Sequence, residues 1–214
     1  METLSIIAVA AIICGSASLL CLLALHFVSP EFEMSWRMVS EYALGRHKWL
    51  LTLFFTLWCL SSVLVAYLLW NIVTTPWATV GVVLVFISGI GAQMGGLFDM
   101  NHKLHGLAGL LGIATLPFAS LLTGYHLVGI KRWSNYQTVI LLSSHAVWIS
   151  LVFLVVSMIL LIAGCKKAGV AMGPDSEPLQ TLPAGVIGIN GYANRILVVC
   201  YIGWLLVIAL AYLA

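Results

Sequence analysis

The chain has 214 residues, of which 62% are hydrophobic and only 7% are charged, whereas about a quarter of the residues of a soluble domain are charged. Its mean hydropathy of +1.11 and its net charge of +2 exclude a soluble domain, a disordered chain and a nucleic-acid-binding protein with a basic face. Membrane lipid is therefore the partner that the composition indicates. The five cysteines show no paired spacing, so we interpret them as buried apolar residues and not as disulfides or zinc ligands.

Six apolar runs are long enough to cross a bilayer, which takes about 20 helical residues. Because the hydrocarbon offers no water to backbone polar groups, such runs must be helices. The sequence thus predicts an all-α integral membrane protein, a single bundle of six transmembrane helices with both termini on one side. The expected spans are residues 4–27, 49–72, 76–96, 104–128, 136–163 and 196–213.

The connections between these runs are unequal. The second and fourth are short, and Thr75 followed by Pro76 is typical of a capped helix start. The first (residues 28–48), third (97–103) and fifth (164–195) connections lie on the same side, and they carry all of the charged side chains except Glu2, Lys131 and Arg132. One face should therefore be polar, and its excess of Lys and Arg places that face in the cytoplasm by the positive-inside rule.

The fifth connection, residues 164–195, divides into two halves. The first half contains Asp175, Ser176 and Glu177, which we expect in water. The second half is apolar and rich in glycine, and we expect it to lie against the bundle at the membrane surface.

Small residues recur at helical spacing in the third and fourth runs. Such residues allow helix backbones to approach closely in lipid, so the pattern predicts close packing of these two helices. The residues are Ser88, Gly91, Ala92 and Gly95, followed by Gly106, Gly109 and Gly112.

A dense polar set lies between the third and fourth runs: Asp99, Asn101, His102 and His105. Carboxylate and imidazole groups are common ligands of divalent metals, so Asp99, His102 and His105 are candidate metal ligands or proton carriers. Their spacing is not that of a helical zinc protease. In the alternative, structural interpretation, Asp99 and Asn101 cap the fourth helix and His102 faces water.

A second polar set lies in the first connection, where Ser40 and Glu41 precede Gly45. Because Arg195 begins the sixth run on the same face, it can converge with both sets. The structural alternative is a short interfacial helix that starts near Ser40 and stops at Gly45.

Four stretches resemble one family, the domain-of-unknown-function family 998, whose members are six-helix membrane proteins of bacteria and archaea. The stretches are Ser40-Glu41-Tyr42-Ala43-Leu44-Gly45, Gly96-Leu97-Phe98-Asp99, Leu104-His105-Gly106-Leu107-Ala108 and Asn194-Arg195 ahead of Trp204. The resemblance spans nearly the whole chain and implies a prokaryotic cell membrane. It also implies that one catalytic or binding site contains Ser40, Glu41, Asp99, His105 and Arg195. The family brings no established reaction with it.

His145 lies well inside the fifth apolar run. An ionisable residue at that depth suggests a proton relay or a cofactor ligand, and the alternative is a neutral imidazole that is hydrogen-bonded across the bundle. It has no partner histidine at matched depth, which disfavours haem.

Three classes of function follow from these residues. In the first, an enzyme acts on a lipid or another amphipathic molecule at the polar face: Asp99 and His105 bind a metal or move a proton, Glu41 acts as base, and Arg195 holds an anionic head group. In the second, the protein is a transporter or channel subunit with His145 in its pathway. In the third, it is a non-catalytic binding or accessory protein whose polar residues lock the loops together.

Overall fold

The computed structural model describes residues 2–170, 179 and 181–214, and this part of the chain is helical and contains no strand. Six helical segments are long and apolar enough to cross a membrane, which confirms the predicted all-α six-span bundle. They are α1 (Glu2–Val28), α2 (Lys48–Trp70), α3 (Pro76–Leu97), the continuous segment that contains α4 (His105–Gly109) and α5 (Thr115–Val128), α6 (Gln137–Lys167), and α7 (Asn190–Leu213).

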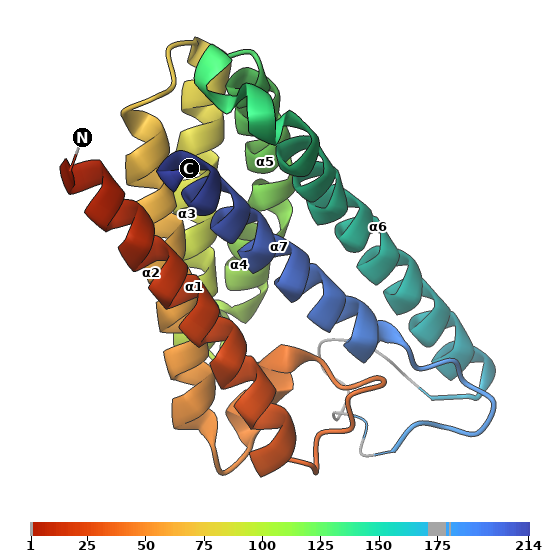
Figure 1. The fold of residues 1–214 in the computed structure, drawn as a ribbon. Coiled ribbons are helices and arrows are strands. Elements are labelled where there is room, and N and C mark those ends of the chain that lie inside the picture. The colour runs from red at the N-terminus through yellow and green to blue at the C-terminus, as the bar shows by residue number, and fades with distance from the viewer. Residues whose placement is uncertain (1, 171–178, 180) are drawn as a thin grey trace.

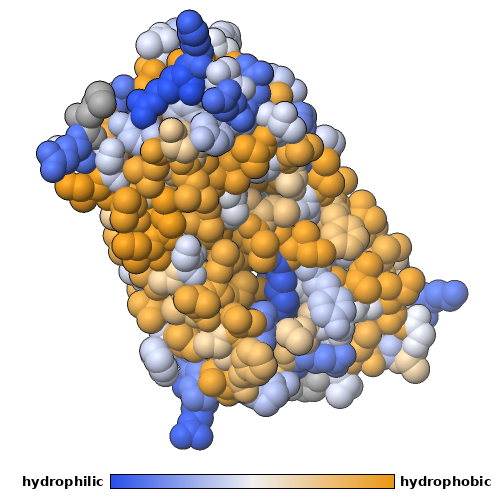
Figure 2. All heavy atoms as spheres, viewed as in Figure 1, coloured by the Kyte–Doolittle hydropathy of each residue, from blue (hydrophilic) through white to orange (hydrophobic). Residues whose placement is uncertain are grey.

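The start of α1 and the end of α7 lie toward the same end of the bundle, and the described residues of the first, third and fifth connections lie at the other end (Figure 1). We call this second end the polar end. A broad hydrophobic band separates the two hydrophilic ends of the molecule (Figure 2). The exposed apolar side chains of this band match what a bilayer requires of a protein surface, so the chain is an integral membrane protein.

Short helices occupy two of the connections. The first contains the 3-10 helix η1 (Val39–Leu44), which is followed by Gly45 and matches the structural alternative for this stretch. The fourth contains the 3-10 helix η3 (Lys131–Tyr136). At the second, Thr75 caps α3 by accepting a hydrogen bond from the Ala78 backbone nitrogen at 3.4 Å, and Pro76 occupies the first turn, as predicted.

The last helix begins at Asn190, before the range expected from the apolar run, which started at residue 196. The early turn is polar in sequence but buried, since Asn190, Asn194 and Arg195 are all buried against the first connection. Tertiary contacts thus extend α7 beyond its hydrophobic stretch. The expectation that Asp175, Ser176 and Glu177 lie in water falls outside the described residues.

The close approach that the small residues predict occurs where Gly91 of α3 meets Gly112. A Cβ atom added to Gly91 would lie 2.1 Å from the backbone nitrogen of Gly112, so no larger residue fits there. In contrast, a Cβ atom on Gly106 or Gly109 would meet no atom within 4 Å. Gly106 and Gly109 therefore border open space, and only Gly112 of the fourth run makes the predicted helix contact.

Gly112 lies in a π-helical turn, η2 (Leu110–Ala114), which joins α4 to α5. A π turn widens the helix and disturbs the regular pairing of its carbonyl groups. Here hydroxyl groups from three helices donate to them: Thr115 to Leu111 O, Ser88 to Gly112 O and Tyr201 to Ile113 O. These bonds fix the widened turn against α3 and α7.

Candidate functional site

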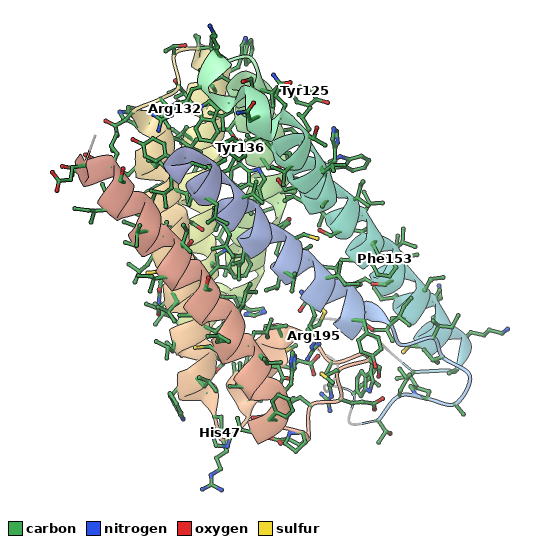
Figure 3. All side chains as sticks on the ribbon, in the orientation of Figure 1. His47, Tyr125, Arg132, Tyr136, Phe153 and Arg195 are labelled. Atoms are coloured by element: carbon green, nitrogen blue, oxygen red, sulfur yellow. The ribbon has the colours of Figure 1, made fainter. Side chains whose placement is uncertain are left out.

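Arg195 lies at the polar end of the bundle, beside the loop of the first connection (Figure 3). Its side chain is only 8% exposed. It donates hydrogen bonds to five acceptors: His26 Nε2 at 2.8 Å, Arg37 O at 2.7 Å, Gly191 O at 2.9 Å, Met34 O at 3.3 Å and Tyr42 Oη at 3.0 Å. Arg195 therefore fastens α1 and the first connection to α7, and its donors are largely occupied by protein groups.

Glu41 is also engaged within the first connection. One carboxylate oxygen accepts from Arg37 Nη1 at 2.6 Å, and the other accepts from the Met38 backbone nitrogen at 2.7 Å. The second bond caps the start of η1, because an acidic side chain near a helix start satisfies a free N–H group. Glu41 thus holds the loop in its folded form.

Asp99 lies at the surface of the third connection. Its carboxylate is 3.5 Å from Lys48 Nζ and accepts from the Asn101 backbone nitrogen at 3.1 Å. His102 is exposed and stacks on Phe98 with ring centroids 4.4 Å apart. Within the described residues, no three His, Cys, Asp or Glu side chains come together as a group that could hold a metal ion.

His105 is oriented by the main chain of the third connection. Its Nδ1 lies 3.0 Å from the carbonyl oxygen of Phe98. Since a carbonyl only accepts, Nδ1 carries the proton, and in the neutral ring Nε2 has a free lone pair. The imidazole lines a cavity, so Nε2 is the nitrogen that remains for a ligand.

This cavity has a volume of about 140 Å³ and lies between η1, α2, α3, the α4–η2 segment and α7. Six of its lining residues are glycine or alanine: Gly91, Ala92, Gly95, Ala108, Gly109 and Gly112. Phe55, Trp58 and Ile113 form part of its apolar wall, and Ser40 and Asn194 line it together with His105. We call this space the central cavity.

Several polar groups in the wall of the central cavity have no protein partner. No described residue forms a hydrogen bond with the Ser40 hydroxyl. Asn194 accepts from the Val39 backbone nitrogen at 2.9 Å through Oδ1, and no described residue accepts from its NH2 group. The Trp58 indole nitrogen is buried without a partner in the described chain, in a side chain that is 3% exposed. Trp58 Nε1 is the buried group of this set, and buried polar groups are normally paired. Together with the half-buried Ser40 hydroxyl and the Asn194 amide, it makes the central cavity a candidate ligand site.

The five residues predicted to form one site therefore occupy three places. Ser40 and His105 line the central cavity, Glu41 and Arg195 hold the first connection, and Asp99 pairs with Lys48 at the surface.

Asn194 and Trp58 are two cavity residues that the sequence did not single out as site residues. Asn194 is part of a stretch that carries the family resemblance, so it could have been chosen, whereas no signal marks Trp58 among eight tryptophans.

His145 lies on α6 and bonds to two aromatic side chains. Its Nδ1 accepts from the Trp148 indole nitrogen at 2.9 Å, and its Nε2 is 3.1 Å from the Tyr125 hydroxyl on α5. The structure therefore has a histidine that is hydrogen-bonded across two helices, as in the second of the two interpretations from the sequence.

One of three comparisons with known proteins found a match. Neither the curated proteins nor the solved structures yield a match to this chain. The family model described as "Protein of unknown function (DUF998)" matches residues 12–211. This range covers all but the ends of the chain and includes η1, His105, Asn194 and Arg195. The chain therefore belongs to the DUF998 family.

Proposed function

We propose that this protein is a membrane enzyme that takes the polar end of a lipid-like molecule into the central cavity, where Ser40 and His105 act on it. The observation that carries the proposal is that three residues lining one cavity each have a polar atom without a partner in the described chain: Ser40 Oγ, His105 Nε2 and the Asn194 amide nitrogen. A paired group must break a hydrogen bond within the protein before it can bind a ligand, whereas these three groups can bind a ligand without that cost.

The placement of the lining residues favours an amphipathic molecule. Ser40 and His105 belong to the connections of the polar end, while Phe55 and Ile113 lie about two helical turns further in, a depth of about 10 Å. A molecule with its polar group near Ser40 and its apolar part toward Phe55 would match this gradient. The size also matches a small group, because an engineered apolar cavity of about 150 Å³ holds benzene.

The chemistry that these groups support is acyl transfer from an ester. The Ser40 oxygen would attack the ester carbonyl carbon while His105 Nε2 takes the hydroxyl proton. The ester C–O bond would then break as His105 returns that proton to the leaving alcohol, and water would release the acid from Ser40 by the same steps. The Asn194 N–H group can donate to the carbonyl oxygen as negative charge develops on it.

A main-chain group orients His105, the proposed base. The Phe98 carbonyl holds the Nδ1 proton of His105, as a second group does for the histidine of serine hydrolases. No hydrogen bond joins Ser40 and His105 in the structure, and such catalytic bonds often tighten only in the substrate complex.

We further propose that the polar end faces the cytoplasm of a prokaryotic cell. The supporting observation is the distribution of Lys and Arg, because all of them except Lys131 and Arg132 lie in the connections of this end or at the adjoining helix ends. Labelling of a single cysteine placed at residue 47 by a membrane-impermeant maleimide tests this: the site should react in inverted vesicles and not in intact cells.

The enzymatic proposal is tested with p-nitrophenyl butyrate, a small ester whose acyl group fits the cavity. Purified protein in detergent should hydrolyse it, and Ser40→Ala and His105→Gln should each lose at least about 100-fold in rate, the usual contribution of an acid–base group. Equal rates in wild type and both variants would refute the roles of Ser40 and His105.

Occupancy of the cavity is tested separately by a matched pair of glycine variants. Gly109 and Gly106 lie one turn apart in α4 and both have open space at Cβ, but only Gly109 lines the central cavity. Gly109→Leu should reduce the lipid that co-purifies with the protein, measured by mass spectrometry, while Gly106→Leu should not. The same retained lipid in both variants would refute binding in this cavity.

A further inference from the structure

A groove of about 360 Å³ lies at the end of the bundle opposite the central cavity, between the start of α3 and the end of α5. Figure 3 shows Tyr125 at this end, far along the bundle from Arg195. The groove is lined by Thr75, Trp77, Leu121, Leu122, Tyr125 and His126. We call it the opposite groove, and it has no part in the function proposed above.

Tyr125 lines this groove, and its hydrogen bond with His145 leaves its hydroxyl group free to donate. The Trp148 indole only donates, so His145 Nδ1 must be the bare acceptor of that 2.9 Å bond. In the neutral ring, His145 Nε2 then carries the proton and donates it to Tyr125 Oη, 3.1 Å away. The hydroxyl proton of Tyr125 has no acceptor in the described chain, and the side chain is 56% exposed.

Thr75 is left as a donor in the same way by His126. The Thr74 backbone nitrogen donates to His126 Nε2 at 3.4 Å, so Nδ1 carries the ring proton and donates to Thr75 Oγ1 at 3.3 Å. That oxygen also accepts from the Ala78 backbone nitrogen. Both acceptor positions of the Thr75 oxygen are filled, and its own proton is available to the groove.

Two residues that line one groove at the edge of the hydrophobic band therefore each have a hydroxyl proton to donate and a histidine that donates to the hydroxyl oxygen. A ligand for this arrangement must offer at least two acceptor oxygens and must reside where the exposed side chains of Trp77 and Tyr125 lie, at the membrane–water interface. The phosphodiester of a glycerophospholipid meets both conditions, and its acyl chains can run along Leu121 and Leu122. We infer that the opposite groove binds the phosphate group of a phospholipid in the leaflet remote from the central cavity.

The inference is tested by native mass spectrometry of the full chain released from nanodiscs that contain phosphatidylglycerol. Wild-type protein should retain one bound phospholipid, and Tyr125→Phe should lower the retained fraction about tenfold, as expected for one hydrogen bond to a charged group. Tyr67→Phe is the matched control, because Tyr67 is 52% exposed on α2 in the same half of the membrane. It should leave the retained fraction unchanged.

Two further arms test whether the phosphate is the group that the two hydroxyls hold. Thr75→Val should weaken retention, and Thr75→Ser, which keeps both the hydroxyl and the helix cap, should restore it. Nanodiscs doped with diacylglycerol supply the ester carbonyls without a phosphate, so diacylglycerol should not be retained. Retention of diacylglycerol, or equal retention by Tyr125→Phe and wild type, would overturn the inference. Neither result bears on the ester hydrolysis expected of Ser40 and His105.

Discussion

Two adjoining regions of the polar end differ in how many of their polar groups are paired by hydrogen bonds. Around Arg195, most donors and acceptors are paired, with Asn190 Oδ1 as a buried exception, and the pairs join α1, the first connection and α7. In the central cavity, Ser40, Asn194 and Trp58 retain groups without a partner in the described chain.

The charged region is therefore the structural one, and the neutral region is the candidate site. The difference teaches that hydrogen-bond pairing, and not charge, shows which side chains at this end are free to meet a ligand. A buried charge is costly unless protein groups compensate for it, and the groups that compensate for Arg195 are the same ones that keep it from a ligand.

The largest expected effect is that of Arg195→Leu. Several buried acceptors lose their donor at once, each at a cost of about 1–3 kcal/mol, so we expect the free energy of unfolding to fall by about 3–5 kcal/mol. Thermal unfolding followed by circular dichroism measures this change. Arg195→Lys should recover little of it, since an ammonium group cannot reproduce the planar donor set. If Arg195→Leu were as stable as wild type but lost its bound lipid, Arg195 would be a ligand-binding residue and not a structural one.

Glu41→Ala should have a smaller effect of the same kind. It removes the partly buried ion pair with Arg37 and the cap at Met38, and we expect a loss of about 1–3 kcal/mol. Glu41→Gln serves as the control, because its amide oxygen can still accept from the Met38 nitrogen. A loss of ester hydrolysis by Glu41→Gln at unchanged melting temperature would instead make Glu41 part of the catalytic apparatus.

Asp99→Asn should change stability by less than about 1 kcal/mol. Its partner Lys48 is exposed and 3.5 Å away, and exposed ion pairs contribute little. The effect should also shrink in high salt, where surface charges are screened. If Asp99→Asn abolished ester hydrolysis while the melting temperature stayed constant, Asp99 would belong to the active site although it does not line the central cavity.

The smallest effect concerns acid stability through Glu33. The Ser35 hydroxyl donates to its carboxylate at 2.6 Å and the Trp36 indole at 3.0 Å, and these bonds hold the pKa of Glu33 below its ordinary value. Because the folded pKa is lowered, the stabilisation is present above about pH 4.3, the unperturbed value, and is lost as the pH falls further. Melting temperatures between pH 3 and 6 should therefore decline slightly less in Glu33→Gln than in wild type. Parallel curves would show that this loop is not coupled to folding.

The fold was predictable because each of its signals is local. Apolar runs of about 20 residues, a Thr75–Pro76 helix start and a Gly45 stop are read from neighbouring residues, and the bilayer leaves no alternative to the helix. The exceptions arose from tertiary contacts: buried polar side chains extend α7 to Asn190, and hydroxyls from other helices support the π turn at Gly112.

The site was predictable only in part. The convergence of the polar end follows from six spans, and Ser40 and His105 do line one cavity. Arg195 and Glu41 were predicted from the family resemblance and from their place on the polar face, and neither signal distinguishes a residue that binds a ligand from one that binds a loop. No feature of the sequence identifies Trp58 as a cavity residue.

The sequence by itself determined that this chain lies in a membrane, how many times it crosses, and which end carries its charges. These properties depend on the sum of many side-chain transfer free energies along single helices, and no single side chain changes such a sum enough to alter the outcome. Only the tertiary structure decided which polar groups are paired and which remain open to a cavity. Pairing depends on distances of about 3 Å between atoms of different helices, and the order of residues along one chain does not specify them.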